Sequence, residues 1–406
     1  MVTGQAVRVT SNRPAPGPRR LLAITVGAQA VIVLPFTGLA AMAVQIRDDI
    51  DFGDSGLGLL LALFSVGALL SSPAVGFLIE RVGPSTGLRI SVAITAIGAL
   101  GLGLLARSWW TFAAFMMLSG CAAALSEPAT NLWIARAVPT RRHGTALGLK
   151  QASGPLASVV SGLFVPLVAL TIGWRWACVM MAVMAVGLLA VVPAVVTEPR
   201  PESRARPTAI EHRLPLALLM TAAFFAYLGQ VTMQVFFVTG AVERGTREGV
   251  AGILLSVGSM AAVGTRLAIG VSIDRRPRSL LRLVTLFLVG GSASCVVLAF
   301  ASPIVIVVAT PLLFAVSSGW PGLFHLAAIQ SYPDATAKVT GLVMSGAFAA
   351  VLIGPITFGA IAGASFAAAW VAVAACYLIA AAVVAAARVR LRATIGAAQL
   401  RAQAIS

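Results

Sequence analysis

Long apolar stretches, separated by short polar and basic loops, follow one another along the whole chain. About twelve of them are long enough to cross a bilayer as helices, which takes about 20 residues each. Their continuous apolar character lacks the alternation of a membrane β-barrel. The pattern therefore predicts an all-α membrane protein with about twelve transmembrane helices, at 21–46, 56–79, 86–106, 109–135, 144–170, 174–197, 214–240, 249–272, 280–301, 303–330, 337–361 and 364–387.

Composition narrows the class of protein. Hydrophobic residues make up 59% of the 406 residues and charged residues only 10%, against about 25% charged in soluble domains. The net charge of +16 would suit a nucleic-acid-binding protein, but the basic residues occupy short loops rather than a polar domain with stacking aromatics. We expect membrane lipids around the protein and no nucleic acid as a partner.

A short phrase occurs twice, at 76–81 and 270–275, each time closing an apolar run and opening a basic loop. The copies lie about half a chain length apart, and a duplicated helical half is the signature of a transporter whose repeats rock about a central site. The long polar interruption at 198–213 predicts a linker between the halves. The predicted organisation is a tail 1–20, a first half 21–197, the linker, a second half 214–387 and a tail 388–406.

Lysine and arginine residues are concentrated in the loops on one side of the predicted bundle. This asymmetry predicts that both termini and the linker are cytoplasmic. The acidic run at Asp48, Asp49, Asp51 and Asp54 then faces outward as a solvated loop. Arginine outnumbers lysine 27 to 2, which favours a GC-rich bacterial genome and hence the bacterial inner membrane.

The repeated phrase resembles the phrase G-x-L-x-D-R-x-G-R-R of the major facilitator superfamily. The first copy has Glu80 in place of the Asp and Pro84-Ser85 in place of the basic pair. The resemblance covers 21–387 and implies two six-helix halves and a cytoplasmic gate held by charges and helix ends. The alternative is that Arg81 and Arg275 only anchor lipid headgroups. The gating residues implied by the resemblance are Gly76, Glu80, Arg81, Gly83, Gly270, Asp274 and Arg275.

Three further segments are similar to bacterial cyanate-permease-like transporters, which move small anionic or polar organic solutes. They are Pro128-x-x-Asn131, the stretch 139–151, and Gly173-Trp174-Arg175-Trp176. Two features compare the chain with drug–proton antiporters, and both depart from the antiporter pattern. The helix 4 arginine of many antiporters is here Met116, and Gly154-Pro155 resembles their helix 5 phrase without its paired glycines. Export of a drug or metabolite by proton antiport stays the alternative function.

Few charged residues fall inside the apolar runs, where each costs at least about 2.5–3.5 kcal/mol at the bilayer centre. Glu127, Lys150 and Arg266 are such residues, and His325 is the intramembrane histidine. At a rise of about 1.5 Å per residue, all four lie roughly 12–14 Å from the cytoplasmic surface. Gln29 reaches the same level, which is the depth of the transport site in carriers built from repeats.

These residues predict a site for an anionic solute and a proton. Lys150 and Arg266 would supply positive charge for a carboxylate-like group, and Glu127 would bind the proton. The solute and Glu127 would compete for Lys150, which couples the two. We also predict that Glu127 contacts Lys150, because their helices are consecutive and antiparallel. Further substrate-binding candidates are Gln29, Asn131, His325, Trp320, Gln230 and Gln234.

Each candidate also has a structural explanation. Lys150 or Arg266 could snorkel to the headgroups, Glu127 could form a purely structural ion pair, and His325 could be a neutral core residue bonded to a backbone carbonyl. Gln230 and Gln234 could simply join two helices.

Other classes of protein find no support in the sequence. No metal-ligand spacing or nucleophile-with-base arrangement indicates an enzyme, no filter-like loop indicates a channel, and the tails and linker are too short for a sensor's output domain. The sequence therefore predicts a proton-coupled secondary transporter of a small, polar, anionic organic solute, monomeric and without cofactor or metal.

Overall fold

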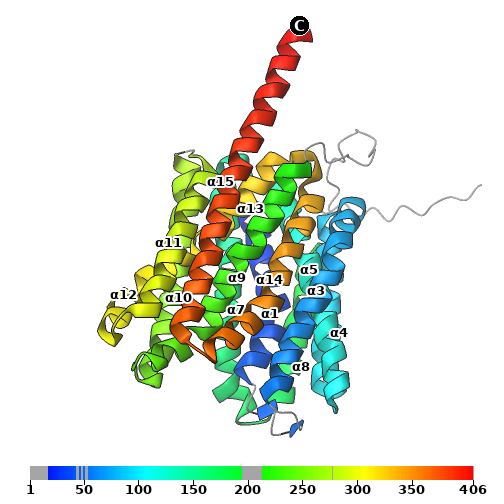
Figure 1. Cartoon of the computed structure of the whole chain (residues 1–406). Coiled ribbons are helices and arrows are strands. Elements are labelled where there is room, and N and C mark those ends of the chain that lie inside the picture. Colours follow the sequence, from blue (N-terminus) through cyan, green and yellow to red (C-terminus); the bar gives the residue numbers. More distant parts are fainter. Residues whose placement is uncertain are drawn as a thin grey trace, which may run out of the picture.

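The computed structural model describes residues 17–42, 45, 46, 49, 50, 54–193, 213–276 and 278–405. Within these residues every regular element is helical, and the helices form one bundle, with most of them running along a common direction (Figure 1). The all-α prediction is confirmed. Regular backbone hydrogen bonds inside each helix are what allow a chain to cross lipid, where no water is present to satisfy them.

The helices fall on either side of the predicted linker, most of which lies outside the described residues. The N-terminal helices are α1 (Pro18–Ala41), α3 (Asp54–Val82), α4 (Pro84–Leu104), α5 (Trp109–Ala137), α6 (His143–Gln151), α7 (Ser153–Phe164) and α8 (Trp174–Val191). The C-terminal helices are α9 (Arg213–Glu243), α10 (Glu248–Arg275), α11 (Leu280–Phe300), α12 (Pro303–Ser318), α13 (Pro321–Ser331), α14 (Thr336–Ala362) and α15 (Phe366–Ile405). The short turns are η1 (Thr140–Arg142), η2 (Val165–Ala169) and η3 (Pro333–Ala335).

Helices extend into both predicted tails. Residues 1–16 are not among the described residues, and α1 already begins at Pro18. The predicted tail at 388–406 is helical as far as Ile405, because α15 continues without interruption. Its last turns project beyond the other helices (Figure 1).

Eleven helical segments of the described chain are long and apolar enough to span a membrane. The remaining predicted span, 144–170, is present but broken, because α6 ends at Gln151 and α7 begins at Ser153. Pro155 accounts for the break: it has no N–H for the carbonyl of Gln151, and its ring clashes with that carbonyl. A second break, ahead of Pro321, separates α12 from α13.

The N-terminal and C-terminal helices pack tightly at one end of the bundle, where α3 meets α14 and α6 meets α10. Glycine permits both contacts. A Cβ at Gly76 would lie 2.8 Å from the carbonyl oxygen of Ala337, and one at Gly270 would lie 2.5 Å from that of Gly144. Small residues let helix backbones approach in this way within membranes. We call this end, formed by the helix termini at 82, 143, 275 and 336, the basic end.

Candidate functional site

A buried ion pair joins α5 to α6 inside the bundle. Lys150 Nζ donates to Glu127 Oε2 at 2.6 Å, and the two residues are 0% and 8% exposed. The predicted contact is confirmed, and the snorkelling alternative for Lys150 is wrong. A buried pair of this kind is stable when further hydrogen bonds satisfy its remaining polar atoms.

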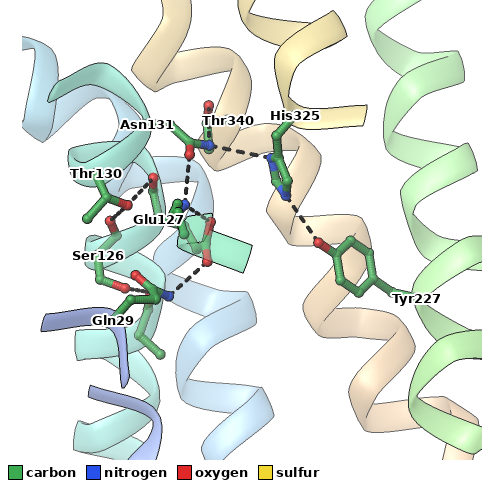
Figure 2. Close-up of polar contacts among 10 residues, drawn as sticks. Gln29, Ser126, Glu127, Thr130, Asn131, Tyr227, His325 and Thr340 are labelled. Carbon is green, nitrogen blue, oxygen red and sulfur yellow. Dashed lines mark hydrogen bonds and ion pairs between the residues drawn. The ribbon is translucent and has the colours of Figure 1, made fainter. Parts of the chain in front are cut away.

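Two amide side chains supply these further hydrogen bonds. Gln29 of α1 donates from Nε2 to Glu127 Oε1 at 2.8 Å, and Lys150 Nζ also donates to Asn131 Oδ1 at 2.7 Å. Figure 2 shows Gln29, Glu127 and Asn131 pointing toward one another from α1 and α5, and Lys150 joins them from α6. Both carboxylate oxygens of Glu127 thus accept a hydrogen bond, which suits an ionised carboxylate beside an ammonium group.

His325 of α13 connects the ion pair to the C-terminal helices. Asn131 Nδ2 lies 3.4 Å from His325 Nδ1 and 3.4 Å from Thr340 Oγ1, and the Tyr227 hydroxyl lies 3.1 Å from His325 Nε2 (Figure 2). Because Asn131 Oδ1 faces Lys150, its amide nitrogen is the group that faces His325. His325 Nδ1 therefore accepts, and the neutral ring donates its Nε2–H to Tyr227. Among the described residues, the histidine ring is bonded to side chains and not to a backbone carbonyl.

Arg266 of α10 is buried but bonds to backbone rather than to this network. It is 4% exposed; its Nε donates to the Ser318 carbonyl at 2.8 Å and its Nη1 to the Gln151 carbonyl at 2.6 Å. These carbonyls lie at the two helix breaks, one on the N-terminal and one on the C-terminal side of the linker. The alternative in which Arg266 snorkels to the headgroups is wrong.

Of the remaining substrate-binding candidates, Trp320 contacts a residue of the network. Trp320 is fully buried, and its ring centroid is 4.9 Å from that of Tyr227. Gln230 and Gln234 of α9 are half-buried and take part in no hydrogen bond among the described residues. The sequence analysis missed Tyr227 and Thr340, because nothing local distinguishes them from other hydroxyls in apolar helices.

The acidic residues of the repeated phrases bind helix N-termini across the bundle. Asp274 of α10 accepts from the backbone N–H of Gly144 and of Thr145 at 2.8 Å each, and from Thr145 Oγ1 at 2.5 Å. Glu80 of α3 accepts from the backbone N–H of Lys338 at 3.0 Å. Helix N-termini carry unsatisfied N–H groups and a partial positive charge, so a carboxylate is the matching partner.

The two contacts correspond to each other as the two repeated phrases do: each joins a phrase in one half of the chain to a helix start in the other half. Asp274 reaches the start of α6 among the N-terminal helices, and Glu80 reaches the start of α14 among the C-terminal helices. Arg81 and Arg275 are exposed and have no hydrogen-bonding or ionic partner in the described part of the chain. Gly83 precedes α4 at a φ of 85°, which favours glycine.

The acidic run contributes a contact at the opposite end of the bundle. Asp49 Oδ2 accepts from Trp174 Nε1 at 3.1 Å and pairs with Arg175 Nη2 at 3.0 Å. Asp49 is exposed, as expected for a solvated loop, and in addition it joins this loop to the start of α8. Asp48 and Asp51 lie outside the described residues, as does the side chain of Asp54.

The helices long enough to span a membrane, with an ion pair buried among them, define a multi-pass α-helical membrane protein. The family model of the Major Facilitator Superfamily matches residues 21–341. The chain belongs to this superfamily, whose matched members are transporters and not enzymes.

Solved structures share the fold at low sequence identity. The Escherichia coli fucose:proton symporter FucP is 15% identical, with a TM-score of 0.74, and the match covers 90% of this chain and 98% of that one. The proton:xylose symporter XylE is 14% identical, with a TM-score of 0.77 and coverage of 91% and 94%. Both confirm the fold alone.

A curated relative matches over a shorter segment. The probable sphingolipid transporter spinster homolog 1 of Arabidopsis thaliana is 26% identical over 140 residues, which are 34% of this chain and 28% of the relative. This chain therefore matches only a minor part of that relative's length.

Proposed function

We propose that this transporter moves a small, polar, anionic organic solute across a bacterial plasma membrane, coupled to protons by alternating access. The observation that carries the proposal is the Glu127–Lys150 ion pair, buried and linked through Asn131 and His325 from the N-terminal to the C-terminal helices. A group that binds a proton and a group that binds an anion are thus in direct contact, at a place that both sets of helices share.

Competition for Lys150 couples the two species. While Glu127 is ionised it occupies Lys150 and leaves little charge for a solute. Protonation of Glu127 removes this partner, and the solute's anionic group then neutralises the ammonium. A buried cation without a partner is costly, so Lys150 favours states that contain either the carboxylate or the solute, and disfavours the state with neither.

The contacts of Glu80 and Asp274 support a role for the repeated phrases as the gate. We propose that the basic end faces the cytoplasm and that this structure is the state closed on that side. Opening would break the Asp274 bonds to α6 and the Glu80 bond to α14 together, because α6 and α14 lie across the bundle from the acids that hold them. Both termini would be cytoplasmic, and the protein would act as a monomer.

The resemblance to cyanate-permease-like transporters favours small anionic or polar organic solutes. The test is pH-gradient-driven uptake of labelled cyanate, lactate and succinate into proteoliposomes, with protein-free liposomes as the control. Stimulation of at least one anion by an inward proton gradient supports the proposal. Uptake that ignores the gradient for every anion would contradict it.

Export by proton antiport is the second candidate, favoured by the break between α6 and α7, directly ahead of the Gly154-Pro155 phrase that resembles one in antiporters. Right-side-out vesicles separate the two functions. Acidifying the outside stimulates uptake by a symporter, whereas in an antiporter it stimulates loss of solute that was loaded beforehand.

A further inference from the structure

Three buried side-chain donors around the helix breaks have no acceptor. They are Arg266 Nη2, Gln151 Nε2 and Trp320 Nε1, none of which has a hydrogen-bonding partner among the described residues. Gln151 is the last residue of α6, and Trp320 directly precedes α13. Buried donors are normally paired. Three donors without acceptors favour a ligand that is rich in acceptor oxygens at this place.

The two breaks fix how Arg266 is presented. Because residue 155 is a proline, the Gln151 carbonyl has no helical N–H to accept, and it accepts from Arg266 Nη1 at 2.6 Å instead. The Ser318 carbonyl is one of the last carbonyls of α12, which lack helical partners, and it accepts from Arg266 Nε at 2.8 Å. With two corners of the planar guanidinium held, Nη2 is the corner left for a ligand.

Lys150 is less available in this conformation, since its ammonium already donates to both Glu127 and Asn131. Arg266, by contrast, has a donor to spare and a full positive charge without a carboxylate partner in the described chain. An anion that enters this conformation would therefore bind first to Arg266.

We propose that Gln151 and Trp320 complete, with Arg266, a binding site that the anionic group of the solute, a carboxylate or similarly small oxyanion, occupies while Glu127 is ionised and Lys150 is engaged. Pro155 is a positioning residue for this site, because it frees the carbonyl that orients Arg266. The inference rests on the proposed function for its solute, but anion binding itself needs neither a proton gradient nor transport.

The test measures binding of formate to the purified full chain in lipid nanodiscs, by thermal stabilisation and tryptophan fluorescence at constant ionic strength. Formamide serves as the neutral control. Formate should stabilise the wild type saturably and formamide should not. Arg266→Gln should weaken formate binding about 10- to 100-fold, as expected for a lost charge-assisted hydrogen bond. Gln151→Leu and Trp320→Phe, which remove one neutral donor each, should weaken it about 3- to 10-fold.

Pro155→Ala tests the positioning role, because it gives the Gln151 carbonyl a helical N–H that competes with Arg266. We expect formate binding about 3- to 10-fold weaker. Pro311→Ala is the matched control: it also removes a proline from inside a helix, α12, but away from the break, and should bind formate as the wild type does.

Two results would overturn the inference. One is the absence of a saturable formate effect in the wild type, which would mean that water alone satisfies the three donors. The other is wild-type formate binding by both Gln151→Leu and Arg266→Lys. The first variant keeps the size of the side chain and the second keeps its positive charge, so both are expected to retain the fold. Formate binding that is intact in Glu127→Gln, beside failed proton-driven uptake in the wild type, would leave this site standing and remove the proposed coupling.

Discussion

Each carboxylate oxygen of Glu127 accepts a hydrogen bond, one from Gln29 and the other from Lys150. A proton on Glu127 would therefore have to replace one of these donors. Glu127→Gln preserves the shape of the side chain and still offers an oxygen to Lys150, but it cannot take up a proton. We expect it to abolish accumulation driven by a proton gradient while solute exchange without a gradient continues. Uptake and counterflow in the same proteoliposomes measure the two activities, and wild-type accumulation by this variant would place the proton site elsewhere.

The ion pair also predicts a specific pattern of stability. Lys150→Ala leaves a buried carboxylate without its cation, which typically costs roughly 3–5 kcal/mol, while removing both charges together is much milder. We therefore expect Glu127→Gln combined with Lys150→Ala to recover most of the stability lost in Lys150→Ala, without recovering accumulation. Unfolding of the purified variants in detergent provides the comparison. Strictly additive losses would mean that the two residues do not interact.

Among the helices, Asp274 holds α10 to the start of α6 at the basic end, because its carboxylate accepts three hydrogen bonds there. Asp274→Asn keeps the size of the side chain but removes the charge that matches the helix N-terminus, which is worth about 0.3–2 kcal/mol. We expect a shift toward structures open at this end and a lower transport rate, with solute affinity changed less. Distances between spin labels on α6 and α10 measure the shift.

Asp334→Asn is the control for this prediction. Asp334 is also acidic and lies at the basic end, beside α14, but it is exposed. It should leave both the distances and the rate unchanged. Equal effects of the two substitutions would show that general surface charge, and not the Asp274 contact, sets the equilibrium.

For the whole molecule, the competition at Lys150 predicts which gradient drives transport. One proton on Glu127 and one monoanion on Lys150 add no net charge to the membrane interior when they move together. We therefore expect uptake of a monoanion to follow the pH gradient and to ignore the membrane potential. Potassium diffusion potentials set by valinomycin, at equal pH on both sides, are the test. A monoanion uptake that rises with the potential would require a second proton or another ion.

Much of the architecture could be predicted from the sequence, because its cause is local. The free energy of moving a residue from water to lipid depends mainly on that residue, and a helix satisfies its own backbone, so continuous apolar runs specify spanning helices. The partnership of Glu127 with Lys150 also followed from position alone. Two buried opposite charges at one depth on consecutive helices have few other ways to avoid the cost of burial.

The contacts between residues far apart in the chain were decided only by the tertiary structure. The bonds from Asn131 to His325 and from His325 to Tyr227 depend on which faces of α5, α13 and α9 meet. The Gln151 carbonyl became a partner for Arg266 only because Pro155 broke the helix at a point where α10 approaches it. Periodicity and composition locate helices, but neither reports the rotation of one helix against another, and hydrogen bonds are decided by that rotation to within a few tenths of an ångström.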